Sequence, residues 1–250
     1  MERKKIDFIS LNIECDKHLD LVFPFLKDNS RVDIIALQEV FEEDFHRMQQ
    51  ETGLNGAFEA VVKLSRLTKD GYGNYGYATF TRHPILESVP IYYAGRSRVK
   101  HLPITQHGAG VSRVDTCVRR TLLVTSIDKD RDAIRVINTK FTWTPDGKPD
   151  RLQRRDIKRV LKILEKFDEF ILLGDFNTPR GGEIYSQLSS HYQDCIPQDI
   201  KSTIDPTHHR RKDLELVVDG VFVTQQYKPG KVEVVTGLSD HVAIVGELFF

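Results

Sequence analysis

The stretch FILLGDFN, residues 170–177, decides the fold, because a run of apolar residues ends abruptly in polar ones. A short apolar run of this kind predicts a buried β-strand, here over residues 170–174. Asp175 and Asn177 follow directly, so the predicted strand delivers a carboxylate and an amide at its end. Ligands of α/β proteins bind outside the ends of such strands. The stretch therefore indicates an α/β fold and the edge of the sheet at which a functional site lies.

Three other segments have the same form, with apolar residues that give way to polar or acidic ones. They are LNIE at residues 11–14, LQE at residues 37–39 and GLSDH at residues 237–241, where a strand follows instead. Carboxylates and amides gathered at one end of a sheet suit a hard cation such as Mg²⁺, which takes oxygen ligands and keeps waters for a substrate phosphate. Spacing alone does not bring the four segments together in space.

The rest of the chain alternates loosely between strand-like and helix-like patterns. Predicted strands cover residues 6–13, 33–37, 57–64, 75–81, 113–127, 133–141, 170–174, 214–223, 231–235 and 241–249, and a turn-rich loop covers residues 68–74. Helices are predicted at residues 18–27 and 151–166, the second with an apolar stripe of Ile157, Val160, Leu161 and Leu164. No repeat, linker or composition break is visible, so residues 1–250 are expected to form one α/β domain with mixed sheets and helices outside.

Composition excludes several classes of protein. Of the 250 residues, 40% are hydrophobic and 29% are charged, and 36 basic residues balance 36 acidic ones, so no global attraction to DNA or membranes is indicated. Cys15, Cys117 and Cys195 show neither metal-ligand spacing nor a disulfide framework, which favours a reducing compartment. No apolar run resembles a signal peptide or a membrane span, so a cytoplasmic location is expected.

Six motifs in order make the pattern specific. They are residues 11–13 (LNI), 38–39 (QE), 75–78 with 82–85 (YGYA and RHPI), 174–180 (GDFNTPR), 218–223 (VDGVFV) and 239–241 (SDH). Together they resemble the endonuclease/exonuclease/phosphatase superfamily of deoxyribonuclease-like phosphoesterases, over nearly the whole chain. The resemblance implies a four-layered α/β sandwich, in which two mixed sheets pack face to face with helices outside. It also implies hydrolysis of phosphate esters with Mg²⁺ or Mn²⁺.

The resemblance also assigns roles to individual residues. It implies that Glu39 is the main metal ligand, with Asn12 and Asp240 nearby. Asp175 would orient and deprotonate the attacking water, and Asn177 would hold this water or the phosphate. His241 would donate to a non-bridging phosphate oxygen with help from Asp240, and Asp219 would orient a neighbouring group. The chemistry requires such a set, because an anionic phosphodiester repels hydroxide until its charge is neutralised.

One position departs from the family pattern. In the segment NTKF, residues 138–141, Lys140 stands where many members carry a histidine that is usually assigned as the general acid. A lysine places positive charge against the leaving oxygen, but its ordinary pKa of ~10.4 makes it a poor proton donor. Some members, such as the abasic-site endonucleases, also lack this histidine and carry a tyrosine there. Lys140→His is therefore expected to raise hydrolysis.

Plainer interpretations stand beside several of these assignments. Asn12 could simply bond a loop backbone, and Asp219 could be structural. Trp143 could stack on a base or sugar, or pack in the core. The basic run at residues 208–212 reads first as a solvated loop and second as a contact for a phosphate-bearing substrate, as do Arg96, Arg98, Lys100 and His101.

Two functions remain open from the sequence. The first is a metal-dependent phosphodiesterase, nuclease or phosphatase, and the resemblance leaves a nucleic acid, a phosphorylated small molecule and a phospholipid headgroup open as its substrate. Its specificity is expected to lie in the loops at residues 92–110 and 201–213. The second is a catalytically impaired pseudoenzyme that binds phosphate-containing ligands, because Lys140 replaces the usual histidine.

Overall fold

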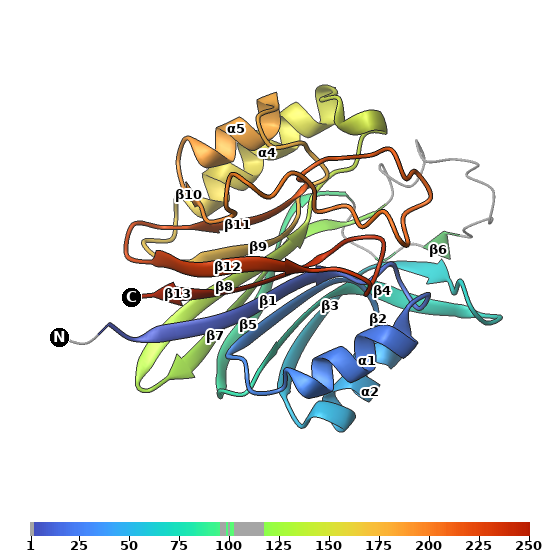
Figure 1. Cartoon of the computed structure of the whole chain (residues 1–250), viewed down its shortest axis with the longest axis horizontal. Helices are drawn as coiled ribbons and strands as arrows, with labels where there is room; N and C mark the ends of the chain where they lie inside the picture. The colour runs from blue at the N-terminus through green and yellow to red at the C-terminus, as the bar shows by residue number, and fades with distance from the viewer. Residues whose placement is uncertain (1–2, 96–98, 100, 103–117) are drawn as a thin grey trace.

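The computed structural model describes residues 3–95, 99, 101–102 and 118–250, and within these residues the strands form one sheet of seven strands and another of six (Figure 1). The first sheet has the order β12 (Lys228–Val235), β13 (Ala243–Phe249), β1 (Lys5–Asn12), β2 (Ile34–Phe41), β4 (Tyr72–Thr81), β3 (Asn55–Ser65) and β6 (His101–Leu102). The second has the order β10 (Gln193–Asp194), β11 (Asp219–Val223), β9 (Ile171–Asp175), β8 (Asp132–Lys140), β7 (Arg120–Lys129) and β5 (Ile85–Ala94). Both sheets are mixed, since β1 pairs with β2 and β8 with β9 in parallel, whereas most other pairs are antiparallel.

Helices cover the outer face of each sheet. The helices α1 (Leu19–Asp28) and α2 (Glu42–Thr52) lie on the first sheet, and α4 (Arg151–Leu164) and α5 (Glu183–Ser189) lie on the second, with a short 3₁₀ turn, η1 (Pro145–Gly147), before α4 (Figure 1). The layers are therefore helix, sheet, sheet and helix. The four-layered α/β sandwich expected from the sequence is confirmed.

The alternation of side chains along each strand fills the layers on both of its faces. On β9, Ile171 and Leu173 pack against residues of the first sheet such as Phe8. Leu172 points the other way and packs against Ile157 of α4. A strand buried on both faces is apolar at every position, which is why the run before Asp175 lacks polar residues.

The helix α4 follows its sequence pattern closely. Ile157, Val160 and Leu164 are buried, as the apolar stripe predicts, and Leu161 is partly buried beside them. The side chain of Asp150 caps the first turn by accepting a hydrogen bond from the backbone N–H of Gln153 at 2.8 Å. The helix ends at Leu164, two residues before the predicted limit.

Some expectations were wrong. Residues 214–218 precede β11 as a loop instead of belonging to the strand, and β4 already begins at Tyr72, inside the expected turn-rich loop. The helices α2 and α5 and the strand β5 were not predicted at all. The expected strand at residues 113–127 begins at Arg120 within the described chain, and residues 113–117 lie outside it. None of the described helices is both long and apolar enough to cross a bilayer.

One buried amide joins the two sheets next to the strand ends. Asn138 of β8 donates to the backbone oxygens of Leu37, at 3.0 Å, and of Ala78, at 2.9 Å, both in the opposite sheet. Its side-chain oxygen accepts from Gln38 Nε2 at 2.8 Å. Because all of these groups are buried, the cross-sheet bonds fix the two sheets in one register. The carboxyl ends of β1, β2, β8 and β9 consequently meet.

Candidate active site

Asn12, the last residue of β1, connects carboxylates from two different sheets. Its amide Nδ2 donates to Glu39 Oε1 and to Asp175 Oδ2, both at 3.1 Å, while its Oδ1 accepts from the backbone N–H of Glu14 at 3.1 Å. The backbone donor fixes which end of the amide is oxygen. Asn12 therefore positions the two carboxylates by donating to them. The same amide thus bonds a loop backbone through its oxygen and two carboxylates through its nitrogen.

Glu39 reaches the site because β2 is irregular at that residue. The pairing of β2 with β4 shifts register between Gln38 and Val40, and Glu39 takes a left-handed backbone conformation with φ 62°. A bulge of this kind changes the direction of one side chain relative to the regular alternation of side chains along the strand. The Sγ of Cys15 lies 3.5 Å from Glu39 Oε2. The sequence showed the glutamate but not the bulge that turns it inward.

Lys140, at the end of β8, places its ammonium group on the same two carboxylate oxygens that Asn12 contacts. It donates to Glu39 Oε1, and its Nζ lies 3.1 Å from Asp175 Oδ2. Burial lowers the pKa of Lys140, but the two carboxylates outweigh it and raise the pKa above its ordinary value. The side chain is thus a fixed positive charge. The structure places it beside both carboxylates.

Asp175 is fully buried and both of its oxygens are engaged. Oδ1 accepts from the backbone N–H of Asn177 at 2.8 Å, and Oδ2 faces Asn12 and Lys140. Burial raises the pKa of Asp175, but the positive charges of Lys140 and His241 and the backbone bond lower it overall. A carboxylate with a lowered pKa stays ionised, so it attracts cations and accepts hydrogen bonds, but it is a weak base.

His241 and Asp219 form a second buried pair on the other side of Asp175. His241 Nδ1 lies 2.8 Å from Asp219 Oδ2. Burial lowers the pKa of His241, yet the neighbouring carboxylates, Asp219 first, raise it to about 10. Burial raises the pKa of Asp219. His241 is therefore an imidazolium at neutral pH, and because Nδ1 faces Asp219, the Nε2–H is the donor left for a ligand.

The segment that holds this pair is short and well bonded. The hydroxyl of Thr203 accepts from the backbone N–H groups of Val218, at 3.0 Å, and Asp219, at 3.1 Å. Ile204 pairs with His241 in an isolated β-bridge. Thr203 is fully buried and belongs to none of the motifs, so its role could not be predicted from the sequence.

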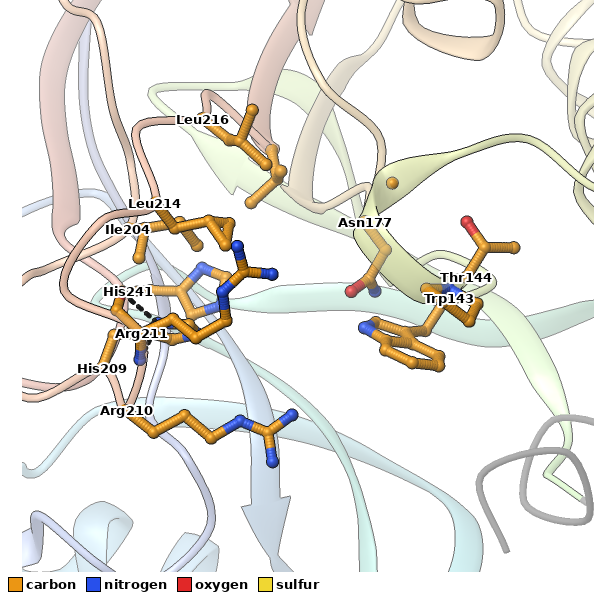
Figure 2. A pocket seen from close by; sticks show the side chains of 13 residues that line it. Trp143, Thr144, Asn177, Ile204, His209, Arg210, Arg211, Leu214, Leu216 and His241 are labelled. Carbon is orange, nitrogen blue, oxygen red and sulfur yellow. Dashed lines mark hydrogen bonds between the residues drawn. The ribbon is translucent and has the colours of Figure 1, made fainter. Parts of the chain in front are cut away.

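Asn177 adopts a left-handed backbone conformation, with φ 50°, which asparagine tolerates better than most residues. Its Nδ2 donates to the backbone oxygen of Phe141 at 2.9 Å. Its side chain also lines a cleft of about 320 Å³ together with His241 and Trp143 (Figure 2). The amide is thus held at the mouth of the site by one bond while it faces the open space.

Asp240 is half-buried and directly precedes His241 in the chain. Its Oδ1 accepts a hydrogen bond from the hydroxyl of Ser239 at 3.3 Å. Burial raises the pKa of Asp240, and the negative charges of Glu14 and Glu39 raise it further. Carboxylates that raise one another's pKa are a favourable environment for an additional cation.

The oxygens of Glu39 and Asp175, which share the Asn12 amide, are of the type that binds hard divalent cations. A second group, Asp175, Asp219 and His241, has ligand atoms within 4.8 Å of one another. Within this group His241 Nδ1 lies 2.8 Å from Asp219 Oδ2, so these two side chains already pair with each other. The Lys140 ammonium already lies where positive charge is favoured.

The structure brings together all of the residues that the sequence singled out for the site: Asn12, Glu39, Lys140, Asp175, Asn177, Asp219, Asp240 and His241, with Trp143 on the cleft wall. Of the basic loop, His209, Arg210 and Arg211 line the same cleft. Arg96, Arg98 and Lys100 lie outside the described residues, as does the side chain of His101.

Comparison with known proteins shows the family and the fold. The sequence profile of the Endonuclease/Exonuclease/phosphatase family matches residues 9–241. An endonuclease/exonuclease/phosphatase from Bacteroides vulgatus is similar in structure, with 18% identity, a TM-score of 0.70 and 98% of each chain covered. The human Nocturnin catalytic domain with bound sulfate has 15% identity and a TM-score of 0.70, covering 100% of this chain and 97% of that one. A humanized D. rerio TDP2 has 14% identity and a TM-score of 0.67, with 98% of each chain covered.

No curated protein matches the sequence. At these identities the solved structures establish the fold alone, whereas the profile spans nearly the whole chain, from β1 to His241. Members of this family are typically hydrolases of phosphate esters and are generally dependent on a divalent metal. The chain belongs to the endonuclease/exonuclease/phosphatase family.

Proposed function

We propose that the protein hydrolyses phosphate esters with the help of a divalent cation, Mg²⁺ or Mn²⁺. The observation that carries this proposal is the position of Asp175 between two pairs of charged side chains. On one side of this carboxylate lie Glu39 and Lys140, and on the other lies the charged pair of His241 and Asp219. Negative and positive groups thus meet around Asp175, and His241 and Asn177 beside it line an open cleft, an arrangement that suits phosphoryl chemistry.

In this proposal Glu39 and Asp240 hold the cation, and Asn12 keeps Glu39 and Asp175 in place. The bound cation supplies charge neutralisation at the phosphate. His241 donates its Nε2–H to a non-bridging phosphate oxygen, with Asp219 fixing the ring. Asn177 binds the phosphate or the attacking water at the mouth of the cleft.

Asp175 orients the attacking water by accepting a hydrogen bond from it. Because its pKa is lowered, it takes up the proton only as the water's oxygen bonds to phosphorus and becomes acidic. Lys140 carries positive charge beside the reacting group but releases a proton reluctantly. Substrates whose leaving oxygen departs without protonation are therefore favoured.

A second candidate function is a pseudoenzyme that binds phosphate-containing ligands without turnover. One observation favours it: the ammonium of Lys140 already contacts both Glu39 and Asp175, the carboxylates that a catalytic cation would share. The two functions differ in a single measurable property, which is hydrolysis that depends on an added metal.

The test is an assay of the purified full chain on bis(p-nitrophenyl) phosphate, p-nitrophenyl phosphate, and single- and double-stranded DNA. Each substrate is incubated with Mg²⁺, with Mn²⁺ and with chelator. We expect hydrolysis that chelator abolishes and that Asp175→Asn lowers by roughly 10²-fold or more. Asp199→Asn, which removes an exposed carboxylate away from the cleft, is the matched control and should keep full activity.

Hydrolysis that survives chelator, or that Asp175→Asn leaves intact, would exclude this mechanism. Absence of hydrolysis with every ester and both metals, in a protein that still binds phosphate compounds, would establish the pseudoenzyme instead.

A further inference from the structure

The cleft beside the site has two chemically different walls. One wall is Trp143 with the turn that follows it, and the opposite wall includes His209, Arg210 and Arg211 (Figure 2). Asn177 and His241 from the proposed catalytic group line the same space. A ligand that fills the cleft therefore contacts the reacting groups, an aromatic ring and a cationic loop at once.

The tryptophan wall is rigid. On one side of Trp143, the hydroxyl of Thr142 donates to Asp156 Oδ2 at 2.8 Å, and Gln153 Nε2 donates to the backbone oxygen of Thr142 at 2.7 Å. Both partners belong to α4, so the segment is tied to the helix. Trp143 is only half-buried, so that part of its ring system is open to the cleft. A fixed and partly exposed indole is a suitable stacking surface for a planar ring.

The basic loop is fixed as well, and its anchor is Asp205. The buried carboxylate of Asp205 accepts hydrogen bonds from the backbone N–H groups of Gly237, at 2.6 Å, and Thr207, at 2.8 Å. The backbone N–H of Asp205 donates to the backbone oxygen of Asp240 at 2.9 Å. The loop that carries Arg210 is thus built on the segment that carries Asp240 and His241.

The loop has internal bonds too. The backbone N–H of Arg211 donates to His209 Nδ1 at 3.1 Å, and Lys212 Nζ donates to the backbone oxygen of Thr207 at 2.7 Å. Arg211 also pairs with Asp213 at 3.1 Å. Arg210, in contrast, is exposed, and Figure 2 shows its side chain extending across the cleft toward Trp143. A loop with this many local bonds presents its charge at a fixed distance from the catalytic groups.

Apolar residues line the same cleft. They are Ile204, Leu214, Leu216 and Val218. This surface suits the carbon atoms of a sugar or base better than a bare inorganic anion. The volume of about 320 Å³ lies at the small end of the range for ligand sites, which fits one nucleotide unit better than a polymer.

We propose that the substrate is a small nucleotide with a second phosphate group, whose base stacks on Trp143 and whose non-reacting phosphate binds Arg210. The inference rests on the proposed function for the position of the reacting phosphate, at Asn177 and His241. A guanidinium suits the second phosphate because its N–H groups match phosphate oxygens in geometry and charge. The net charge of the protein is zero, which agrees with a small substrate that is attracted by the basic residues of the cleft alone.

The test uses a property of the sequence. Trp143 is the only tryptophan of the chain, so its fluorescence reports directly on stacking in the cleft. The full chain with Mg²⁺ is titrated with adenosine 3′,5′-bisphosphate, adenosine 5′-monophosphate, ribose 5-phosphate and a short single-stranded oligonucleotide, and fluorescence is recorded immediately after mixing. We expect quenching by the two adenosine compounds, none by ribose 5-phosphate, and about tenfold tighter binding of the bisphosphate than of the monophosphate.

Arg210→Ala should weaken bisphosphate binding about tenfold and leave monophosphate binding unchanged. The matched control is Lys201→Ala, which removes one exposed positive charge outside the cleft and should change neither affinity. Trp143→Phe, followed by calorimetry, should retain most of the affinity, whereas Trp143→Ala should lose it for both adenosine compounds.

Equal affinity for the two adenosine compounds, or an Arg210→Ala variant that binds both as the wild type does, would overturn the proposal. Tighter binding of the oligonucleotide than of the bisphosphate would overturn its commitment to a small substrate. These outcomes are independent of turnover, because hydrolysis of bis(p-nitrophenyl) phosphate is measured separately. Hydrolysis without selective binding of the bisphosphate would contradict only this inference. Selective binding without hydrolysis would contradict only the proposed enzymatic function.

Discussion

Lys140 and Asp175 are register partners at the ends of two parallel strands, and the Lys140 ammonium lies 3.1 Å from Asp175 Oδ2 while it also donates to Glu39. The chain thus supplies its own cation to two carboxylates that a divalent metal would need. Metal and ammonium compete for the same negative charge, because two positive charges at this distance repel each other strongly in a buried site. Metal affinity should therefore depend on Lys140.

Lys140→Met is expected to bind Mn²⁺ at least about tenfold more tightly than the wild type, because it removes this repulsion while nearly retaining side-chain length. Titration of bound Mn²⁺ by electron paramagnetic resonance measures the affinity without any turnover. Lys140→Arg, which keeps the charge, should remain close to the wild type. Equal affinity in Lys140→Met and the wild type would show that the metal binds elsewhere or that the lysine moves away at no cost.

Lys140→His should raise the rate of hydrolysis at neutral pH by at least about tenfold, most clearly for esters with poor leaving groups. The reason is that the pKa of Lys140 is raised by Glu39 and Asp175, so the ammonium holds its proton, whereas an imidazolium can release one. The comparison of kcat for p-nitrophenyl and alkyl phosphodiesters measures the effect. Lys140→Gln separates loss of charge from gain of an acid, and a histidine variant no faster than the glutamine variant would contradict this role.

Asp33 predicts how stability depends on pH. Burial raises the pKa of its carboxyl, but His83, the backbone N–H of Asp7, Lys129 and Arg82 all bond to it and lower the pKa to about 2. A carboxyl whose pKa is lower in the folded than in the unfolded state contributes stability above about pH 4, and this contribution is lost as pH falls toward 2.

The wild type should therefore lose about 2 kcal/mol of unfolding free energy through this one group between pH 4 and pH 2. Urea denaturation at several pH values measures the loss. Asp33→Asn should be less stable at neutral pH and should show a shallower decline on acidification. The exposed variant Asp199→Asn should follow the wild-type curve. If Asp33→Asn and the wild type decline in parallel, the carboxyl is not depressed in the folded protein.

The strands that carry the site could be predicted because burial on both faces leaves a recognisable run of apolar residues in the sequence. A strand buried on both faces, such as β9, must be apolar throughout, and the change to Asp175 marks its end without any knowledge of the fold. The strand β5 could not be found in this way, since most of its residues are at least partly exposed and Pro90 lies within it. The helix α2 begins without a side-chain cap and buries few residues, among them Phe45 and Met48, so its sequence carries little signal.

The connections within the site could not be predicted, because they depend on contacts between distant segments. The bulge that turns Glu39 inward is set by the pairing of β2 with β4, and the bonds of Asn138 cross from one sheet to the other. The basic run at residues 208–212 was interpreted as a solvated loop. Its sequence does not show that Asp205, just before it, bonds to the segment that precedes His241. Residue types were visible in the sequence, and their partners were not.

Gly174 tests how tightly the site is built. A Cβ at this position would lie 2.0 Å from the backbone oxygen of Thr139, its register partner on β8, so neither strand could stay in place. Gly174→Ala should lower the free energy of unfolding by roughly 3 kcal/mol and displace Asp175, the next residue. Gly53→Ala is the control, because its Cβ would meet no atom within 4 Å and only the left-handed backbone, with φ 71°, opposes it at a cost of roughly 1 kcal/mol. Urea denaturation compares the two, and the metal affinity of the folded fraction reports on the position of Asp175. If Gly174→Ala were no more destabilising than Gly53→Ala, the close approach of β8 and β9 that sets the Lys140–Asp175 distance would not be a feature of the protein in solution.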